Sequence, residues 1–201
     1  MKANLKAFQS DTVEAKQILK NSGQFLIGAD VIAHLIPERH PMIMVDRITD
    51  YRTSPQRQLS AERYVSANEP VFVGHFTNLK LWPGVHTIEG LRQCCVLLDV
   101  LYQLEKVDLL DGLLALQRSP LQPQADKELC QRVLDTLPRI SQLGQSPLRL
   151  RVKLLAPVFA GCVIEYQVLQ TNPDMHSWSV QAEVNGKKVA KGEIVCPSSA
   201  V

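Results

Sequence analysis

Alternating apolar and polar residues predict strands in two parts of the chain. Period-2 alternation runs over residues 42–51 and again over 58–67, with a turn-rich segment between them. The C-terminal third carries four more such runs, at 148–155, 162–170, 176–184 and 188–195. Because successive side chains of a strand point to opposite faces, these runs predict an antiparallel sheet, and Asn185-Gly186 predicts a two-residue hairpin turn.

A helical period separates the two groups of strands. It runs from Pro83-Gly84 to about Leu104, and two stripes of its residues are apolar. One stripe holds Ile88, Leu91, Cys95, Leu98 and Tyr102, and the other holds Val85, Val96 and Val100. A helix with two apolar stripes is buried on most of its circumference. The sequence therefore predicts an α+β fold, in which an antiparallel sheet wraps around a long central helix.

Two segments stand outside this plan. Residues 1–28 are polar with a modest helical pattern, so they are interpreted as an N-terminal helical extension of a single domain, 29–201. Residues 107–146 form an insertion, in which 126–137 predicts an amphipathic helix. We interpret this insertion as a lid or an interface element.

A short helix is also expected near the start of the domain. Asp30 is positioned to cap it, and it should run through Leu35 and end before Pro37.

Composition narrows the class of protein. The chain has 201 residues, 45% of them hydrophobic, which is enough for one buried core and short for two domains. A formal net charge of +2, from scattered charges, argues against nucleic-acid binding. The chain has five cysteines, an odd number, and they follow no C-x-x-C spacing. This pattern indicates neither a disulfide framework nor a zinc site, and a reducing cytoplasm is the expected location. No apolar run approaches the roughly 20 residues of a membrane span, so neither membrane insertion nor secretion is expected.

The candidate chemistry lies between residues 68 and 93. His75 precedes the start of the long helix at Pro83-Gly84, and Glu89 lies inside that helix. A histidine suits proton abstraction at neutral pH, and a carboxyl group buried on an apolar helix is pushed toward its neutral, proton-donating form. Taken alone, each residue has a commoner explanation: a histidine that packs and a glutamate that faces water.

This segment resembles the signature of the β-hydroxyacyl-acyl carrier protein dehydratases. In that family a G-H-F-P tetrapeptide is followed by P-G and then by a helix that bears Glu or Asp. Gly74-His75-Phe76 matches the tetrapeptide, and the separations of nine positions to Gly84 and fourteen to Glu89 equal those of the family. Further parts of the chain resemble the family at 36–47, 68–70, 152–161 and 184–190.

The resemblance implies a hot-dog fold and a division of roles in the site. His75 would be the general base, and Glu89 from the other protomer of a homodimer would protonate the leaving hydroxyl. The backbone N–H of Gly84 would polarise the thioester carbonyl, and Gln93 would help to hold Glu89. The two remaining substrate-binding residues implied are Phe76 and Val85.

The implied activity is the dehydration of a (3R)-hydroxyacyl thioester to the trans-2-enoyl thioester, in fatty-acid-like or polyketide biosynthesis. The substrate would be carried on the phosphopantetheine arm of an acyl carrier protein, with no metal and no other cofactor. The resemblance implies a homodimer at least and leaves a higher oligomer open.

The chain departs from the family pattern in ways that keep other functions open. Thr77, Asn78 and Lys80 replace residues of the family's proline- and glycine-containing loop. Arg92 stands three positions after Glu89, where it can pair with that carboxylate and hold it ionised, or turn to Asp99 or to the partner subunit. The alternatives are a catalytically weakened hot-dog protein that binds acyl carrier protein or acyl thioesters, and a thioesterase.

Overall fold

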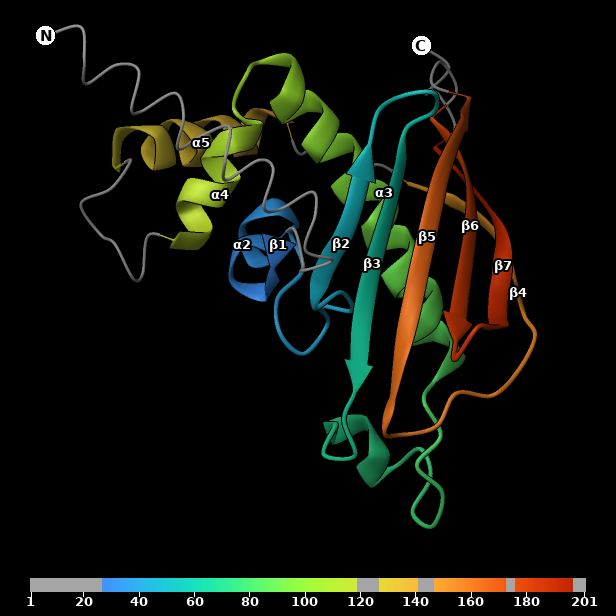
Figure 1. The fold of residues 1–201 in the computed structure, drawn as a ribbon. Coiled ribbons are helices and arrows are strands. Elements are labelled where there is room, and N and C mark those ends of the chain that lie inside the picture. The colour runs from blue at the N-terminus through green and yellow to red at the C-terminus, as the bar shows by residue number, and fades with distance from the viewer. Residues whose placement is uncertain (1–26, 119–126, 141–146, 173–175, 197–201) are drawn as a thin grey trace, which may run out of the picture.

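A single antiparallel sheet forms one layer of the molecule (Figure 1). The structure, a computed structural model, describes residues 27–118, 127–140, 147–172 and 176–196; the predicted helix of the N-terminal extension lies outside these ranges. The sheet has seven strands in the order β1-β2-β3-β5-β6-β7-β4. They are β1 (Ile27–Gly28), β2 (Arg47–Arg52), β3 (Gln58–Val65), β4 (Arg149–Leu154), β5 (Cys162–Asn172), β6 (Ser177–Val184) and β7 (Lys187–Val195).

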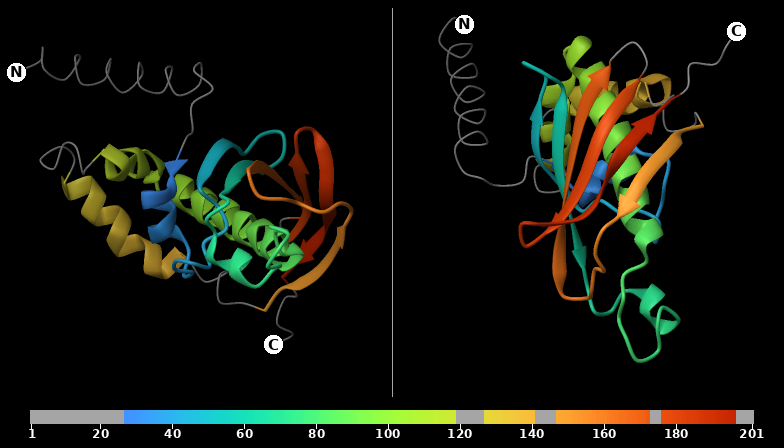
Figure 2. Two further views of the ribbon diagram at one scale, coloured as in Figure 1. Left: turned by 90° about the horizontal axis from the view of Figure 1, so that it is seen from below. Right: turned by 90° about the vertical axis from the view of Figure 1, so that its right-hand side faces the viewer.

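The long helix α3 (Gly84–Lys106) lies across the concave face of this sheet (Figure 2). It packs against β3, β5, β6 and β7. Inward side chains alternate along the strands, as Leu59, Ala61 and Val65 do on β3. The predicted α+β architecture, a sheet wrapped around a central helix, is confirmed, and it is the hot-dog arrangement.

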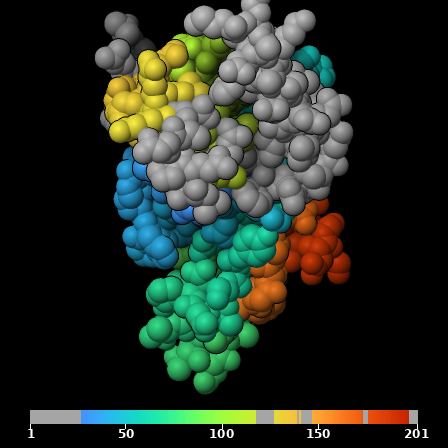
Figure 3. Space-filling view, turned by 60° about the vertical axis from the view of Figure 1, so that its left-hand side comes forward, coloured from blue at the N-terminus to red at the C-terminus, as the bar shows by residue number. Residues whose placement is uncertain are grey.

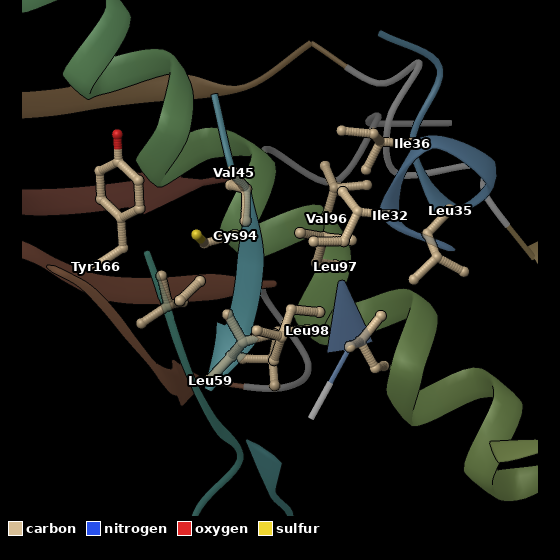
Figure 4. Close-up of a cluster of buried hydrophobic side chains, with 14 of the residues drawn as sticks. Ile32, Leu35, Ile36, Val45, Leu59, Cys94, Val96, Leu97, Leu98 and Tyr166 are labelled. Carbon is tan, nitrogen blue, oxygen red and sulfur yellow. The ribbon is translucent and has the colours of Figure 1, made fainter. Parts of the chain in front are cut away.

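Shorter helices cover the side of α3 that faces away from the sheet. They are α2 (Ala29–Leu35), α4 (Leu110–Arg118) and α5 (Lys127–Ile140), and each of the last two contacts both α2 and α3. As a result every residue from Gln93 to Leu101 on α3 is buried. Figure 4 shows side chains from α2 and α3 meeting in this core. The predicted burial of the helix on most of its circumference is confirmed.

The insertion contains more helix than its sequence predicts. The amphipathic helix expected at 126–137 is found as α5, with Val133 and Leu137 buried, but α4 was not predicted. Both helices lie toward the end of the molecule opposite the β3–α3 connection (Figure 1). They therefore cover α2 and the later turns of α3. This position does not agree with the prediction of a lid over the start of α3.

Three boundary predictions near the N-terminus were wrong. The sheet includes Ile27 and Gly28, which the sequence assigned to the extension. The N-cap of α2 is Gly28 with no side-chain cap, and Asp30 lies in the first turn instead. The strand expected from residue 42 begins at Arg47, and the backbone of Met42 and Met44 before it bonds to a side chain of α3.

Gln93 makes that connection. Its amide oxygen accepts a hydrogen bond from the backbone N–H of Met44 at 2.8 Å, and its amide nitrogen donates to the carbonyl oxygen of Met42 at 2.7 Å. The Gln93 side chain is completely buried. A buried polar side chain of α3 thus fixes the chain segment that leads into β2.

We expect Gln93→Met to lower the free energy of unfolding by about 2 kcal/mol or more, because it leaves the buried backbone N–H of Met44 and the carbonyl oxygen of Met42 without their partners. Chemical denaturation followed by circular dichroism measures this change. The matched control is Gln181→Met on β6, where only one exposed hydrogen bond to Gln167 is lost. Equal stability of the two variants would contradict the assigned role of Gln93.

Gly90 is a point of close approach between α3 and the sheet. A Cβ atom at this position would lie 2.4 Å from Cζ of Tyr166, whose ring is completely buried on β5. Gly90→Ala should therefore destabilise the fold by about 1–3 kcal/mol through overpacking. Gly74→Ala is the control in the same denaturation experiment, since nothing lies within 4 Å of its added Cβ. Unfolding of Gly90→Ala at the same denaturant concentration as the native protein would contradict the close packing of Gly90 on Tyr166.

Candidate active site

His75 lies in the connection between β3 and α3, just after a short 3-10 helix, Pro70–Val73. The carbonyl oxygen of Val71 accepts a hydrogen bond from the His75 backbone N–H at 3.0 Å. The His75 ring nitrogen Nδ1 lies 2.8 Å from the carbonyl oxygen of Leu81. A carbonyl oxygen only accepts, so Nδ1 carries a hydrogen and Nε2 of the neutral ring is left as an acceptor.

Hydrogen bonds to the backbone close the loop that follows His75, which begins with a cis peptide bond between His75 and Phe76. Phe76 and Leu79 exchange N–H to carbonyl bonds of 2.7 and 3.0 Å. Lys80 Nζ donates to the carbonyl oxygen of Ala67 at 2.8 Å. These bonds give the loop a defined geometry without the prolines that the family places there.

A buried ion-pair network supports the start of the same connection. Arg63 on β3 donates to Asp46 and to Glu69, at 2.7 Å each, and Asp46 also accepts the backbone N–H of Tyr64. The arrangement makes Asp46 a structural anchor. No local pattern in the sequence indicated that Arg63 would be its partner.

Glu89 lies one and a half turns into α3 and is held by two neighbours on the same helix. Arg92 donates to it through Nε at 2.8 Å and through Nη2 at 2.7 Å, and Gln93 donates through Nε2 at 2.8 Å. The predicted contact between Gln93 and Glu89 is thus present. Arg92 also pairs with Glu38, which lies between α2 and β2.

Within one chain, Arg92 takes the first of the orientations that the sequence left open for it. Arg92 turns to Glu89 and not to Asp99, and the pKa of its guanidinium is raised mainly by its hydrogen bonds to Glu89. A guanidinium that donates twice to one carboxylate favours the ionised carboxylate. The helix that carries Glu89 therefore also supplies the cation that pairs with it.

Gly84 is the first residue of α3, where backbone N–H groups have no partner inside the helix. The side chain of Leu154, at the end of β4, lies directly against it: a Cβ on residue 84 would be 2.2 Å from Cδ1 of Leu154. The absence of a side chain on Gly84 permits this approach of the edge strand to the helix start. The N–H groups there lie at the positive end of the helix dipole, which favours a polar or anionic group of a ligand.

Apolar side chains gather in the exposed surface around His75 and Gly84. Phe76 is 50% exposed and stacks on His75 with 4.3 Å between the ring centroids, while Val85 is 67% exposed. The other exposed members are Leu79, Leu154, Leu155 and Phe159. Figure 3 shows the β3–α3 connection as a protruding end of the molecule. An apolar patch of this kind is typical of a binding surface.

His86 is a third titratable group near the start of α3. Its ring packs edge-on against Trp82 with 4.9 Å between centroids, and its Nδ1 is buried without a hydrogen-bond partner. Burial and the nearby Arg63 guanidinium lower the pKa of His86.

His75 and Glu89 of one chain make no hydrogen bond with each other. The contacts of His75 are with Leu81 and Phe76, and those of Glu89 are with Arg92 and Gln93. The prediction that Glu89 acts from a second protomer is not tested by a single chain and stays a prediction.

Other features of the described residues lie away from this site. A polar hollow of about 400 Å³ lies on the outer face of the sheet, over β2, β3, β5 and β6. No cluster of three or more His, Cys, Asp or Glu side chains in the described ranges has the arrangement of a metal site. Among the described helices, none is both long enough and apolar enough to cross a membrane.

Comparison with known proteins points to the same segment. The family model for the FabA-like domain matches residues 36–111. The 3-hydroxyacyl-[acyl-carrier-protein] dehydratase FabZ of Neisseria meningitidis is 45% identical over 78 residues, which are 39% of this chain and 51% of the relative. The protein of the same name from Pseudoalteromonas translucida is 43% identical over 67 residues, 33% of this chain and 43% of the relative. The chain spans about half the length of the curated relatives it matches.

A solved structure with a similar chain is the dehydratase heterocomplex ApeI:P from Xenorhabdus doucetiae. The sequence identity is 16%, the TM-score is 0.45, and the match covers 84% of this chain and 91% of that chain. A likeness at this level does not bear on function. The predicted resemblance to the β-hydroxyacyl-acyl carrier protein dehydratases is confirmed by the family model and the curated relatives, over the segment that holds His75, Gly84 and Glu89.

Proposed function

We propose that the protein dehydrates a (3R)-hydroxyacyl thioester, carried on acyl carrier protein, to the trans-2-enoyl thioester in fatty-acid-like or polyketide biosynthesis. The observation that carries this proposal is the placement of His75. Its ring is oriented by Leu81, it leaves Nε2 free to accept a proton, and it stands among exposed apolar side chains at the start of α3. The similarity to named dehydratases over residues 36–111 supports the same reaction.

His75 is the general base of the proposed reaction. Nε2 takes the proton from the α-carbon, and the electron pair of that C–H bond forms the new double bond while the bond from the β-carbon to its hydroxyl oxygen breaks. Negative charge that develops on the thioester oxygen lies near the N–H of Gly84, at the positive end of the α3 dipole. Phe76 and Val85 supply apolar surface for the acyl chain.

Glu89 of a second protomer supplies the proton for the departing hydroxyl, directly or through a water, so that water leaves. Gln93 holds the carboxyl group in place from the next turn of the helix. The reaction moves one proton to His75 and one from Glu89, so it needs no metal and no organic cofactor other than the phosphopantetheine arm that carries the substrate. A cytoplasmic location agrees with such a carrier-bound substrate.

The edge of the sheet supports a homodimer. β4 is the last strand in the sheet order, so one side of its backbone has no neighbouring strand among the described residues. Leu150 and Leu154 on this strand are 42% and 53% exposed. An open edge with exposed leucines is suited to pair with a second copy across a two-fold axis.

The ion pair between Arg92 and Glu89 favours a second candidate function. A Glu89 held ionised has no proton to give, and the protein would then bind acyl thioesters or acyl carrier protein without efficient dehydration. Binding of a hydroxyacyl thioester with no enoyl product distinguishes this candidate from the enzyme.

His75→Ala should lower the dehydration rate by about 10²–10⁴-fold, because it removes the general base. The assay incubates the purified protein with a panel of hydroxyacyl and enoyl thioesters and follows loss or gain of water by mass spectrometry. His34→Ala, an exposed histidine on α2, is the control and should retain the native rate. A His75→Ala protein that folds and turns over normally would rule out the proposed mechanism.

Mixed dimers test the sharing of the site between protomers. We expect His75→Ala and Glu89→Gln to be inactive separately, while a dimer with one chain of each carries one intact site. Such a dimer, purified through two different tags after co-expression, should show about half of the native activity. If both residues act within one chain, the mixed dimer stays as inactive as its parents.

A further inference from the structure

Arg92 stands between two carboxylates. Its Nη2 donates to Glu89 and also to Glu38, and its Nε donates to Glu89. The side chains of the three residues are only 16–22% exposed. One partly buried guanidinium therefore donates hydrogen bonds to two carboxylates that lie far apart in the sequence.

The group has an excess of acid over base. If both carboxylates are ionised, the three side chains together carry one net negative charge, and Gln93 adds none. Like charges that share a partly buried site favour the binding of a proton by one of them. Oε2 of Glu38 is buried and has no hydrogen-bond partner, so the Glu38 carboxyl is not fully stabilised in its ionised form.

Other titratable groups near the cluster do not compensate for this charge. His86, one turn before Glu89 on α3, has a pKa lowered by burial and is neutral at neutral pH. Burial raises the pKa of the Cys95 thiol, which adds no charge near Arg92. The guanidinium of Arg39 donates to the backbone carbonyls of residues 36–38 and not to the Glu38 carboxylate.

We propose that Glu38 is a positioning residue that offsets the charge of Arg92, so that Glu89 retains the ability to bind and release a proton. This inference rests on the proposed function, in which Glu89 is the acid. Arg92 then orients Glu89 through two hydrogen bonds, and Glu38 opposes the electrostatic effect of Arg92 on its protonation.

The test compares Glu38→Gln with Arg92→Met. The amide oxygen that Glu38→Gln introduces can still accept the hydrogen bond from Arg92, so this variant removes one charge and preserves the contact. The first readout is the titration of Glu89 by ¹³C NMR, in protein labelled at the glutamate carboxyl carbon and assigned with Glu89→Gln. The second readout is the pH profile of the dehydration rate. The rate falls as the pH rises, because Glu89 then loses the proton that it donates.

The expected shifts have opposite signs. Glu38→Gln removes a negative charge, so the titration of Glu89 and the falling limb of the rate profile should move to lower pH by about one unit. Arg92→Met removes a positive charge and should move both to higher pH. Glu165→Gln on the exposed face of β5 makes the same change away from the cluster and should move neither.

Either of two results would overturn the proposal: a Glu89 titration that Glu38→Gln leaves in place, or one that it moves to higher pH. The NMR titration does not need turnover. If no thioester is dehydrated by the native protein, the proposed function fails, and the coupling of Glu38 to Glu89 is still measured.

Discussion

The three hydrogen bonds of the Gln93 amide are the interaction on which the site depends. α3 is surrounded by the sheet on one side and by α2, α4 and α5 on the other, so a polar group in its middle turns must find partners inside the protein. Gln93 finds them in the backbone of Met42 and Met44 and in the carboxylate of Glu89. One buried side chain therefore fixes both the approach to β2 and the orientation of the proposed acid.

The two reactive groups are controlled by different kinds of neighbour. His75 is oriented by a backbone carbonyl, which selects the ring tautomer without adding charge. Glu89 is oriented by a charged side chain, which fixes its geometry and at the same time places a positive charge beside it. The arrangement at His75 suits catalysis directly, whereas the one at Glu89 requires a second negative charge nearby, and Glu38 supplies it.

The sequence predicted those helices and strands whose apolar residues recur at a regular spacing. α3 and the strands from β3 onward repeat their apolar pattern over many residues, and the Asn185-Gly186 turn has positive φ at both residues, as its sequence indicates. β1 has two residues, too few for any period, and α4 is a short Leu-rich segment that contains Gly112. Among site residues, the resemblance to the dehydratase signature implied His75, Gly84, Glu89 and Gln93 together, but nothing local to Glu38 indicated a contact with Arg92.

The contacts of the insertion connect it to the same cluster. Gln117 on α4 accepts a hydrogen bond from the backbone N–H of Gly28 at 2.8 Å, and Gly28 is the residue from which α2 begins. α2 is packed on α4 and α5 and leads, within three residues of its end at Leu35, to Glu38. The insertion therefore packs on the helix that leads to Glu38, whose carboxylate pairs with Arg92.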